Sequence, residues 1–322
     1  MRNVRNVGKR KEQTYMIKKK SNQTLIGCLC ALACESIYGF SYIFTKQATE
    51  TVSAFALLGW RFLIAFIVMS LCIMFKVVKI NINIKEKSFK PLLFVGVFSP
   101  ALYYIGETIG ISRTTASESG VFLACIPIAS LLASTLILKE KPAKMQLIGI
   151  SITLVGVLIT VFAVGSAASL SVVGYLFLLL AVISYALYSV FVEKASDHSG
   201  AEITYAMLLI GAVVFVILSL IEAVMVGNVR ELLILPVQNS SFRMAVLYQG
   251  IGSSVLAFFL SNAAIAKIGV NRAASFIGAS TVVSILAGAL FLHENFSALQ
   301  FAGAAVIIIG VYAANINGKD QA

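Results

Sequence analysis

Residues 138–157 read LKEKPAKMQLIGISITLVGV, and residues 292–311 read LHENFSALQFAGAAVIIIGV. The two stretches align without a gap when the chain is shifted by 154 residues, so that Glu140 meets Glu294. The same shift superimposes a glutamine, a glycine and a closing Gly-Val pair in each stretch. Similarity at one fixed spacing indicates an internal repeat.

The repeat extends toward the N-terminus beyond these two stretches. In the same register Phe122 meets Phe276. Further back the shift becomes 147 residues, and a segment that begins at Tyr38 then aligns with one that begins at Tyr185. The chain is therefore predicted to consist of two related halves.

The composition places both halves in a membrane. Of the 322 residues, 59% are apolar and 12% are charged. A soluble domain cannot bury that much apolar surface. A spanning helix needs roughly 20 apolar residues to cross a hydrocarbon core about 30 Å thick, so the chain has room for roughly ten. Hydropathy and helix-breaking residues place the spans near 23–46, 52–75, 91–110, 115–138, 144–163, 173–194, 202–225, 242–264, 271–292 and 298–315.

The distribution of positive charge predicts how these helices are oriented. Most of the 25 Lys and Arg residues fall in alternate loops, above all in residues 2–20, 76–90 and 139–144. This bias places both termini in the cytoplasm. The turn at 139–142 is basic, whereas its repeat partner at 293–296 has no Lys or Arg, so the two turns are expected on opposite sides of the membrane.

Each half holds five spans, and equivalent helices therefore cross the membrane in opposite directions. We expect a basic cytoplasmic tail over 1–22, a first repeat over 23–163, an inverted second repeat over 173–315 and a cytoplasmic tail over 316–322. Inverted repeats are typical of transporters, in which two halves exchange conformations around a site near the midplane. The fold class is an all-α, multi-pass protein of the cell membrane with a central cavity.

Several motifs carry a family resemblance over about residues 23–315. They are Thr114-Thr115-Ala116-Ser117 leading to Pro127, Leu138-Lys139-Glu140-Lys141 with Gln146 and Gly149, the echo of that motif from Leu292 to Gly310, and Arg61 after Trp60. The chain resembles the drug/metabolite transporter superfamily, and specifically its EamA-type permeases with ten spans. One departure is Thr281, which stands where the first half has Pro127, so the fourth and ninth helices are not assumed to bend alike.

The resemblance implies a substrate cavity between the repeats, lined mainly by spans one to four and six to nine. It implies transport of a small molecule, with export of amino acids or related metabolites as the leading hypothesis. Coupling to protons, exchange and facilitated movement all stay open, as do a monomer and a homodimer. The expected partners are membrane lipids and the substrate. No nucleic acid, cofactor or metal is expected.

Charged residues inside spans are costly, so they are functional candidates. Glu35 lies in the first span with Tyr38 and Tyr42 on the same helical face. A carboxylate beside tyrosine hydroxyls can bind a substrate amine or carry a proton. The alternative is an ion pair with Arg61 that only fastens two helices.

The second span carries Arg61 directly after Trp60, at least nine residues from either end of the span. A guanidinium at that depth can hold a substrate carboxylate through a bidentate pair of hydrogen bonds. The structural alternative is a buried partner for Glu35 or Glu107.

The third span carries Glu107 with Tyr104 one turn behind it, and the equivalent part of the eighth span carries Asn262. We interpret this polar group as cavity lining. Tyr185 and Tyr188 on the sixth span mirror the tyrosine face of the first span, although such tyrosines often serve packing alone. These residues complete the candidate substrate-binding set.

Two other classes of protein fit the sequence less well than a transporter does. A membrane-embedded enzyme acting on lipid or isoprenoid substrates needs a clustered acid/base or metal constellation, and the sequence contains no such motif. A receptor or scaffold would carry a sizeable loop or soluble domain, whereas the longest loop between spans lies near 226–241. A non-enzymatic permease is the prediction.

Overall fold

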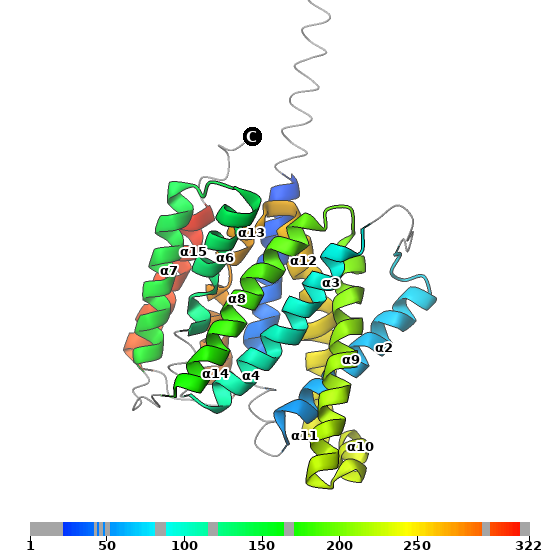
Figure 1. The fold of residues 1–322 in the computed structure, drawn as a ribbon. Helices are drawn as coiled ribbons and strands as arrows, with labels where there is room; N and C mark the ends of the chain where they lie inside the picture. Colours follow the sequence, from blue (N-terminus) through cyan, green and yellow to red (C-terminus); the bar gives the residue numbers. More distant parts are fainter. Residues whose placement is uncertain are drawn as a thin grey trace, which may run out of the picture.

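The structure is a computed structural model that describes residues 22–41, 44, 48, 52–80, 88–114, 122–163, 171–291 and 297–315. Within those ranges the regular structure is helical (Figure 1). Among the described residues, short π-helical segments, labelled η, interrupt two of the helices (η1 and η3) and end a third (η2).

The helices of the first half begin with an unlabelled helix, Asn22–Ser41. It is followed by α2 (Ala54–Met74), α3 (Lys90–Gly96), η1 (Val97–Leu102), α4 (Tyr103–Ser112), α6 (Ile126–Ala133), η2 (Ser134–Leu138) and α7 (Lys144–Phe162). The second half contains α8 (Val172–Lys194), α9 (Gly200–Val226), α10 (Val229–Gln238), α11 (Ser240–Leu247), η3 (Tyr248–Leu256), α12 (Ala257–Ile268), α13 (Val270–Ala274), α14 (Gly278–Phe291) and α15 (Ala298–Asn315).

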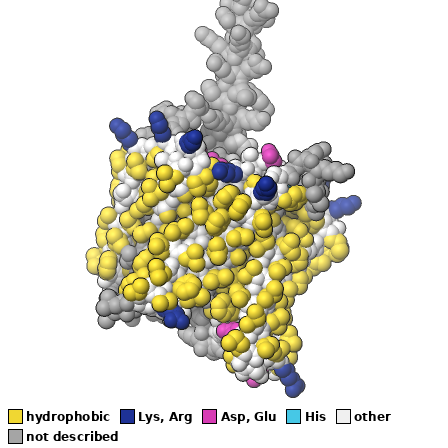
Figure 2. All heavy atoms as spheres, in the orientation of Figure 1, with side chains coloured by type: hydrophobic (Ala, Val, Ile, Leu, Met, Phe, Trp, Pro, Cys, Tyr) yellow, Lys and Arg dark blue, Asp and Glu magenta, His cyan; other side chains and the backbone are white. Residues whose placement is uncertain are grey.

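Nine helical stretches in the described part of the chain are long and apolar enough to cross a membrane, and Phe122–Leu138 is a shorter apolar helix. Together they make up the ten spans expected from hydropathy, with ends that differ by a few residues. Apolar side chains cover the visible face, while Lys and Arg gather mainly along one end (Figure 2). The chain is an all-α, multi-pass membrane protein with ten spans.

The last helix of each half packs against the other at very short range. Gly149 of α7 lies against Ala314 of α15, and Gly156 lies against Ile307. As the residue number rises in one helix it falls in the other, so the two helices are antiparallel (Figure 1). Because α7 and α15 occupy equivalent places in the 154-residue repeat, this packing shows directly that the repeats are inverted.

Small residues make this approach possible. A Cβ on Gly156 would lie 2.7 Å from the backbone nitrogen of Ile307 and 2.8 Å from the carbonyl oxygen of Gly303. Backbone atoms cannot move aside as a flexible side chain can. The glycines that recur in the internal repeat therefore fasten the two repeats to each other.

The third and eighth spans share an irregularity in the middle. η1 and η3 overlap in the 154-residue register, and each interrupts an otherwise α-helical span. Within η1 the backbone of Ser99 is extended (φ −144°, ψ 120°) before Pro100. Interrupted helices in transporters expose backbone groups toward a cavity at the midplane.

The fourth and ninth spans are also interrupted, near their beginnings. In the fourth span a turn at Cys125 precedes Pro127, which occupies the first turn of α6. In the ninth, residues 275–277 form a turn between α13 and α14 although Thr281 replaces the proline. Each of the two spans is thus interrupted near its own N-terminal end, at slightly different positions in the repeat.

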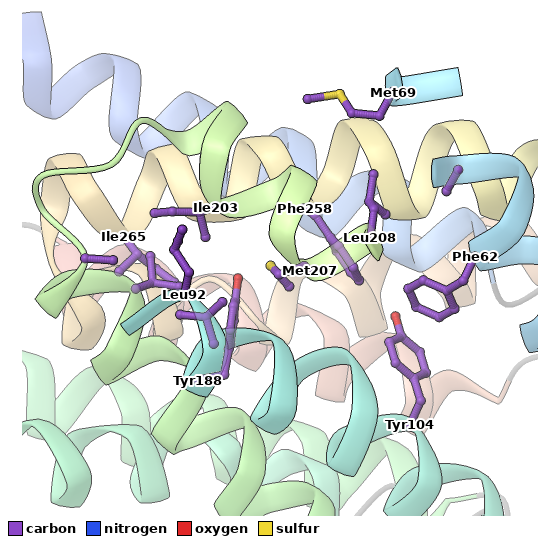
Figure 3. Close-up of a cluster of buried hydrophobic side chains, with 14 of the residues drawn as sticks. Phe62, Met69, Leu92, Tyr104, Tyr188, Ile203, Met207, Leu208, Phe258 and Ile265 are labelled. Carbon is purple, nitrogen blue, oxygen red and sulfur yellow. The ribbon is translucent and has the colours of Figure 1, made fainter. Parts of the chain in front are cut away.

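The central core lies where α2, α4, α8, α9 and α12 meet. Phe62 is fully buried and stacks on Phe215, with ring centroids 5.1 Å apart. Figure 3 shows Tyr104 and Tyr188 projecting into this cluster from α4 and α8, with Phe62 beside Tyr104. Polar side chains therefore enter an otherwise apolar core, and these carry the candidate site.

Candidate functional site

Arg61 is buried in the centre of the helix bundle, with 6% of its surface exposed. Its Nε donates a hydrogen bond of 2.7 Å to the Ser254 hydroxyl, and its Nη2 donates one of 2.8 Å to the Tyr104 hydroxyl. The guanidinium also lies 4.7 Å from the centre of the Tyr104 ring, a cation–π distance. Second-half η3 and first-half α4 thus hold the charge from both sides.

The carboxylate partners considered for Arg61 are not bonded to it. Among the described residues no Asp or Glu forms an ion pair with Arg61, and its two side-chain bonds are both to hydroxyl groups. Neither Glu35 nor Glu107 therefore makes the direct ion pair that was the structural alternative. A guanidinium has five N–H donors, so its capacity for binding an anion is not exhausted.

Glu107 is half-buried on α4, about one turn after Tyr104. The Tyr103 hydroxyl donates a hydrogen bond of 2.8 Å to Glu107 Oε1. Tyr103 and Tyr104 are in edge contact, with ring centroids 5.0 Å apart. The carboxylate and the guanidinium thus sit at two ends of one tyrosine pair.

Contacts between tyrosines continue from α4 onto α8. The Tyr103 ring contacts Tyr185 at 5.6 Å between centroids, and Tyr185 contacts Tyr188 at 5.4 Å. Tyr38 also packs against this core from the first helix. We call Tyr38, Tyr103, Tyr104, Tyr185 and Tyr188 the tyrosine row.

Asn262 anchors the far end of the tyrosine row. Its Oδ1 accepts a hydrogen bond of 2.7 Å from the Tyr188 hydroxyl, and its Nδ2 donates one of 3.0 Å to Thr204. Ser261 lies 3.3 Å from the same tyrosine hydroxyl. The sixth, seventh and eighth spans are joined here by fully buried polar contacts.

Glu35 lies on the other side of the row, with 6% of its surface exposed. It lines a cavity whose free volume is about 10 Å³, room for roughly one water molecule. Polar groups in the cavity wall include Cys34, Tyr185, Ser189 and Ser261. In the described part of the chain Glu35 forms no ion pair.

Trp60 points away from this polar group. Its indole Nε1 donates a hydrogen bond of 2.9 Å to the carbonyl oxygen of Leu232 in α10. The ring packs with Ala56, Ala223 and Leu232, which joins the end of α2 to the short helix α10. Of the expected site residues that the structure describes, Trp60 is the one that the fold does not bring to the cluster.

The remaining expected site residues either meet in the core or lie outside the described part of the chain. The helices bring together Glu35, Tyr38, Arg61, Tyr104, Glu107, Tyr185, Tyr188 and Asn262 through the contacts above. Tyr42 lies outside the described residues.

Ser254, which holds Arg61, was not expected. In the 154-residue register it meets Pro100, so the repeat contains no signal for it. Gln249 was also missed; it is 1% exposed, and its Nε2 donates to the carbonyl oxygen of Ser41 at 3.1 Å. A polar residue inside an apolar span was the available signal for both.

The arrangement is that of a helical membrane transport protein: two inverted repeats with buried charges and tyrosines at their interface. The chain belongs to the EamA-like transporter family, whose model matches residues 25–162 and 172–316. The drug/metabolite transporter resemblance found in the sequence is thereby confirmed.

Sequence similarity to known proteins supports the same family. The chain is 32% identical over 291 residues to the "Uncharacterized transporter YcxC" of Bacillus subtilis (strain 168), covering 90% of this chain and 92% of that protein. It is 21% identical over 178 residues to a "Probable amino-acid metabolite efflux pump" of Salmonella typhimurium (strain LT2), covering 55% and 59% of the two chains. A crystal structure with 19% sequence identity superimposes with a TM-score of 0.70 over 92% of this chain and 96% of its own, which shows the shared fold.

Proposed function

We propose that this transporter exports amino acids or closely related metabolites across the cytoplasmic membrane by alternating access. The observation that carries the proposal is the set of buried charges along the tyrosine row. Arg61 offers N–H donors for a carboxylate, and Glu107 and Glu35 are acceptors for an ammonium group. A zwitterion satisfies both signs at once, which matters because an unpaired charge is costly in a low-dielectric interior.

The tyrosine row supports the same class of substrate. Aromatic faces attract ammonium groups, and tyrosine hydroxyls can donate or accept hydrogen bonds. The name of the Salmonella relative supports amino-acid metabolites and export as the direction. The transporter names of the relatives also favour a permease over a membrane-embedded enzyme.

The substrate class is tested with purified protein in liposomes under imposed proton and potential gradients. Amino acids are compared with two matched analogue sets, amines that lack the carboxylate and acids that lack the amino group. We expect transport of at least one amino acid, and at least about tenfold weaker competition by either analogue set, since each lacks a charged hydrogen-bonding group. Transport of none of the panel, or equal competition by both analogue sets, would contradict the proposal.

Glu35 is proposed to carry the coupling proton. A carboxylate enclosed in a cavity for about one water, without an ion pair in the described part of the chain, is suited to alternate between proton and substrate. We expect Glu35→Gln to abolish the dependence of transport on an imposed pH gradient, because an amide cannot exchange that proton. Substrate-driven counterflow without a gradient measures the binding that remains. Glu222→Gln near the end of α9 is the control; an unchanged pH response in Glu35→Gln would exclude this role.

A further inference from the structure

The Glu35 cavity ends at one face of α8. Tyr185 and Ser189 line the cavity, and Glu193 follows four residues later on the same helical face. Glu193 therefore lies one turn beyond the cavity, toward the basic end of the molecule. That end is the one predicted to face the cytoplasm.

A group of polar contacts surrounds Glu193 at this end of the bundle. Glu193 Oε2 accepts a hydrogen bond of 2.9 Å from the backbone N–H of Val270. The Ser134 hydroxyl donates one of 2.6 Å to Asn271 Oδ1, and Asn271 Nδ2 lies 3.4 Å from Glu140 Oε2. The carboxyl of Glu140 is a direct neighbour of Glu193. We call Ser134, Glu140, Glu193, Val270 and Asn271 the inner latch.

The inner latch connects the two repeats. Ser134 lies at the end of the fourth span and Glu140 in the turn just after it, whereas Asn271 belongs to the start of the ninth, so the bonds of Asn271 join the repeats. The bond from Val270 to Glu193 lies within the second repeat and holds α13 against α8. The backbone N–H of Val270 donates to Glu193, and Val270 also lines the Glu35 cavity, so this bond holds part of the cavity wall in place. In alternating access one repeat rocks against the other, and bonds between them at one end must break when that end opens.

The positions related to the latch by the internal repeat do not reproduce it. In the 154-residue register Ser134 meets Gly288, and Asn271 meets Ser117. In the 147-residue register Glu193 meets Lys46. A glycine has no hydroxyl to donate, so the equivalent hydrogen bond cannot form at the opposite end. The restraint is a property of one end of the transporter.

We propose that the inner latch is the cytoplasmic gate: the bonds of Asn271 to Ser134 and Glu140 hold the Glu35 cavity closed to the cytoplasm until they break during each transport cycle, and Glu193 keeps α13 in the position that these bonds need. The proposal rests on the transporter function but not on the identity of the substrate. Ser134 and Glu193 act as positioning residues, because they hold α13 and do not reach the substrate.

Cys34 is a native reporter for this gate. It lines the same cavity, is 1% exposed, and its thiol donates to the carbonyl oxygen of Ala257 at 3.3 Å. The test uses the full chain with the other four cysteines, at positions 28, 30, 72 and 125, replaced by alanine. A charged, membrane-impermeant methanethiosulfonate reagent is applied to inside-out and right-side-out vesicles, and the rate of Cys34 labelling is measured.

We expect Ser134→Ala and Glu193→Ala each to accelerate labelling from the cytoplasmic face about 2- to 10-fold, the range for loss of one hydrogen bond. Labelling from the outer face should not rise. Glu193→Gln keeps an acceptor oxygen for Val270 and should label at close to the parent rate.

The matched control is Ser130→Ala, one turn earlier on the same helix. Ser130 is fully buried, and among the described residues its hydroxyl has no hydrogen-bond partner. Its rate should equal that of the parent. An unchanged rate in both latch variants, or an equal rise from both faces, would overturn the gate, since the second result reports a loosened fold. No substrate is needed, so a failed transport assay and a failed gate are separate results.

Discussion

Replacing Arg61 with lysine is expected to weaken substrate binding by about 10- to 100-fold, the range for losing a charge-assisted hydrogen bond. Lysine keeps the positive charge but has no planar fork with which to hold a carboxylate while also bonding Ser254 and Tyr104. The thermal unfolding temperature should stay close to that of the parent, because a buried cation still finds the two hydroxyl groups. Substrate affinity and thermal unfolding are measured on the same purified sample.

The control for this change is Arg113→Lys, which alters an exposed arginine at the end of α4. It should leave both measurements unchanged. Tyr104→Phe provides a second variant, because it removes one of the Arg61 partners without changing a charge. If Arg61→Lys unfolds the protein while Tyr104→Phe keeps full affinity, Arg61 serves the fold and does not contact the substrate.

A valine at Gly310 is expected to destabilise the fold by about 1–3 kcal/mol or more, as overpacking of a close contact does. A Cβ there would lie 2.5 Å from the backbone nitrogen of Thr153 and 2.8 Å from the carbonyl oxygen of Gly149. The antiparallel pair of α7 and α15 would have to separate. Thermal unfolding in detergent and the monodisperse fraction after solubilisation measure the effect.

The matched control is Ala305→Val, which adds apolar volume to the exposed face of the same helix, α15. That face should accept the larger side chain with little change in thermal unfolding. Equal stability of the two variants would show that the contact between the repeats tolerates separation and that the glycines have another role.

The sequence predicts which polar residues gather in the core more reliably than it predicts their contacts. Glu35, Arg61 and Glu107 stand out because charges are rare in spans, and the fold places them along one row of tyrosines. Their contacts were left open between a substrate and an ion pair with one another, and the structure gives Arg61 two hydroxyl partners, Ser254 and Tyr104, instead of an acidic residue. Helical periodicity indicates which face of one helix a residue occupies. It does not determine the height or rotation of a second helix that is distant in the chain.

Trp60 illustrates the same limit. It precedes Arg61 in the sequence, yet successive residues on a helix point in different directions, and the indole bonds α10 at the end of the bundle. α10 lies between two spans, where hydropathy predicts only a loop. The contact depends on a helix 172 residues further along the chain.

The sequence alone determined the membrane class, the ten spans and the two inverted halves, because hydropathy, charge bias and a fixed repeat spacing are all properties of the linear chain. The tertiary structure decided which charges are paired, where the cavity ends and what closes it. The inner latch depends on a hydroxyl in the fourth span meeting an amide in the ninth, 137 residues away. Such a contact exists only once the two repeats have packed, since its geometry is set by the glycine contacts of α7 and α15 and the core around Phe62, not by any local pattern.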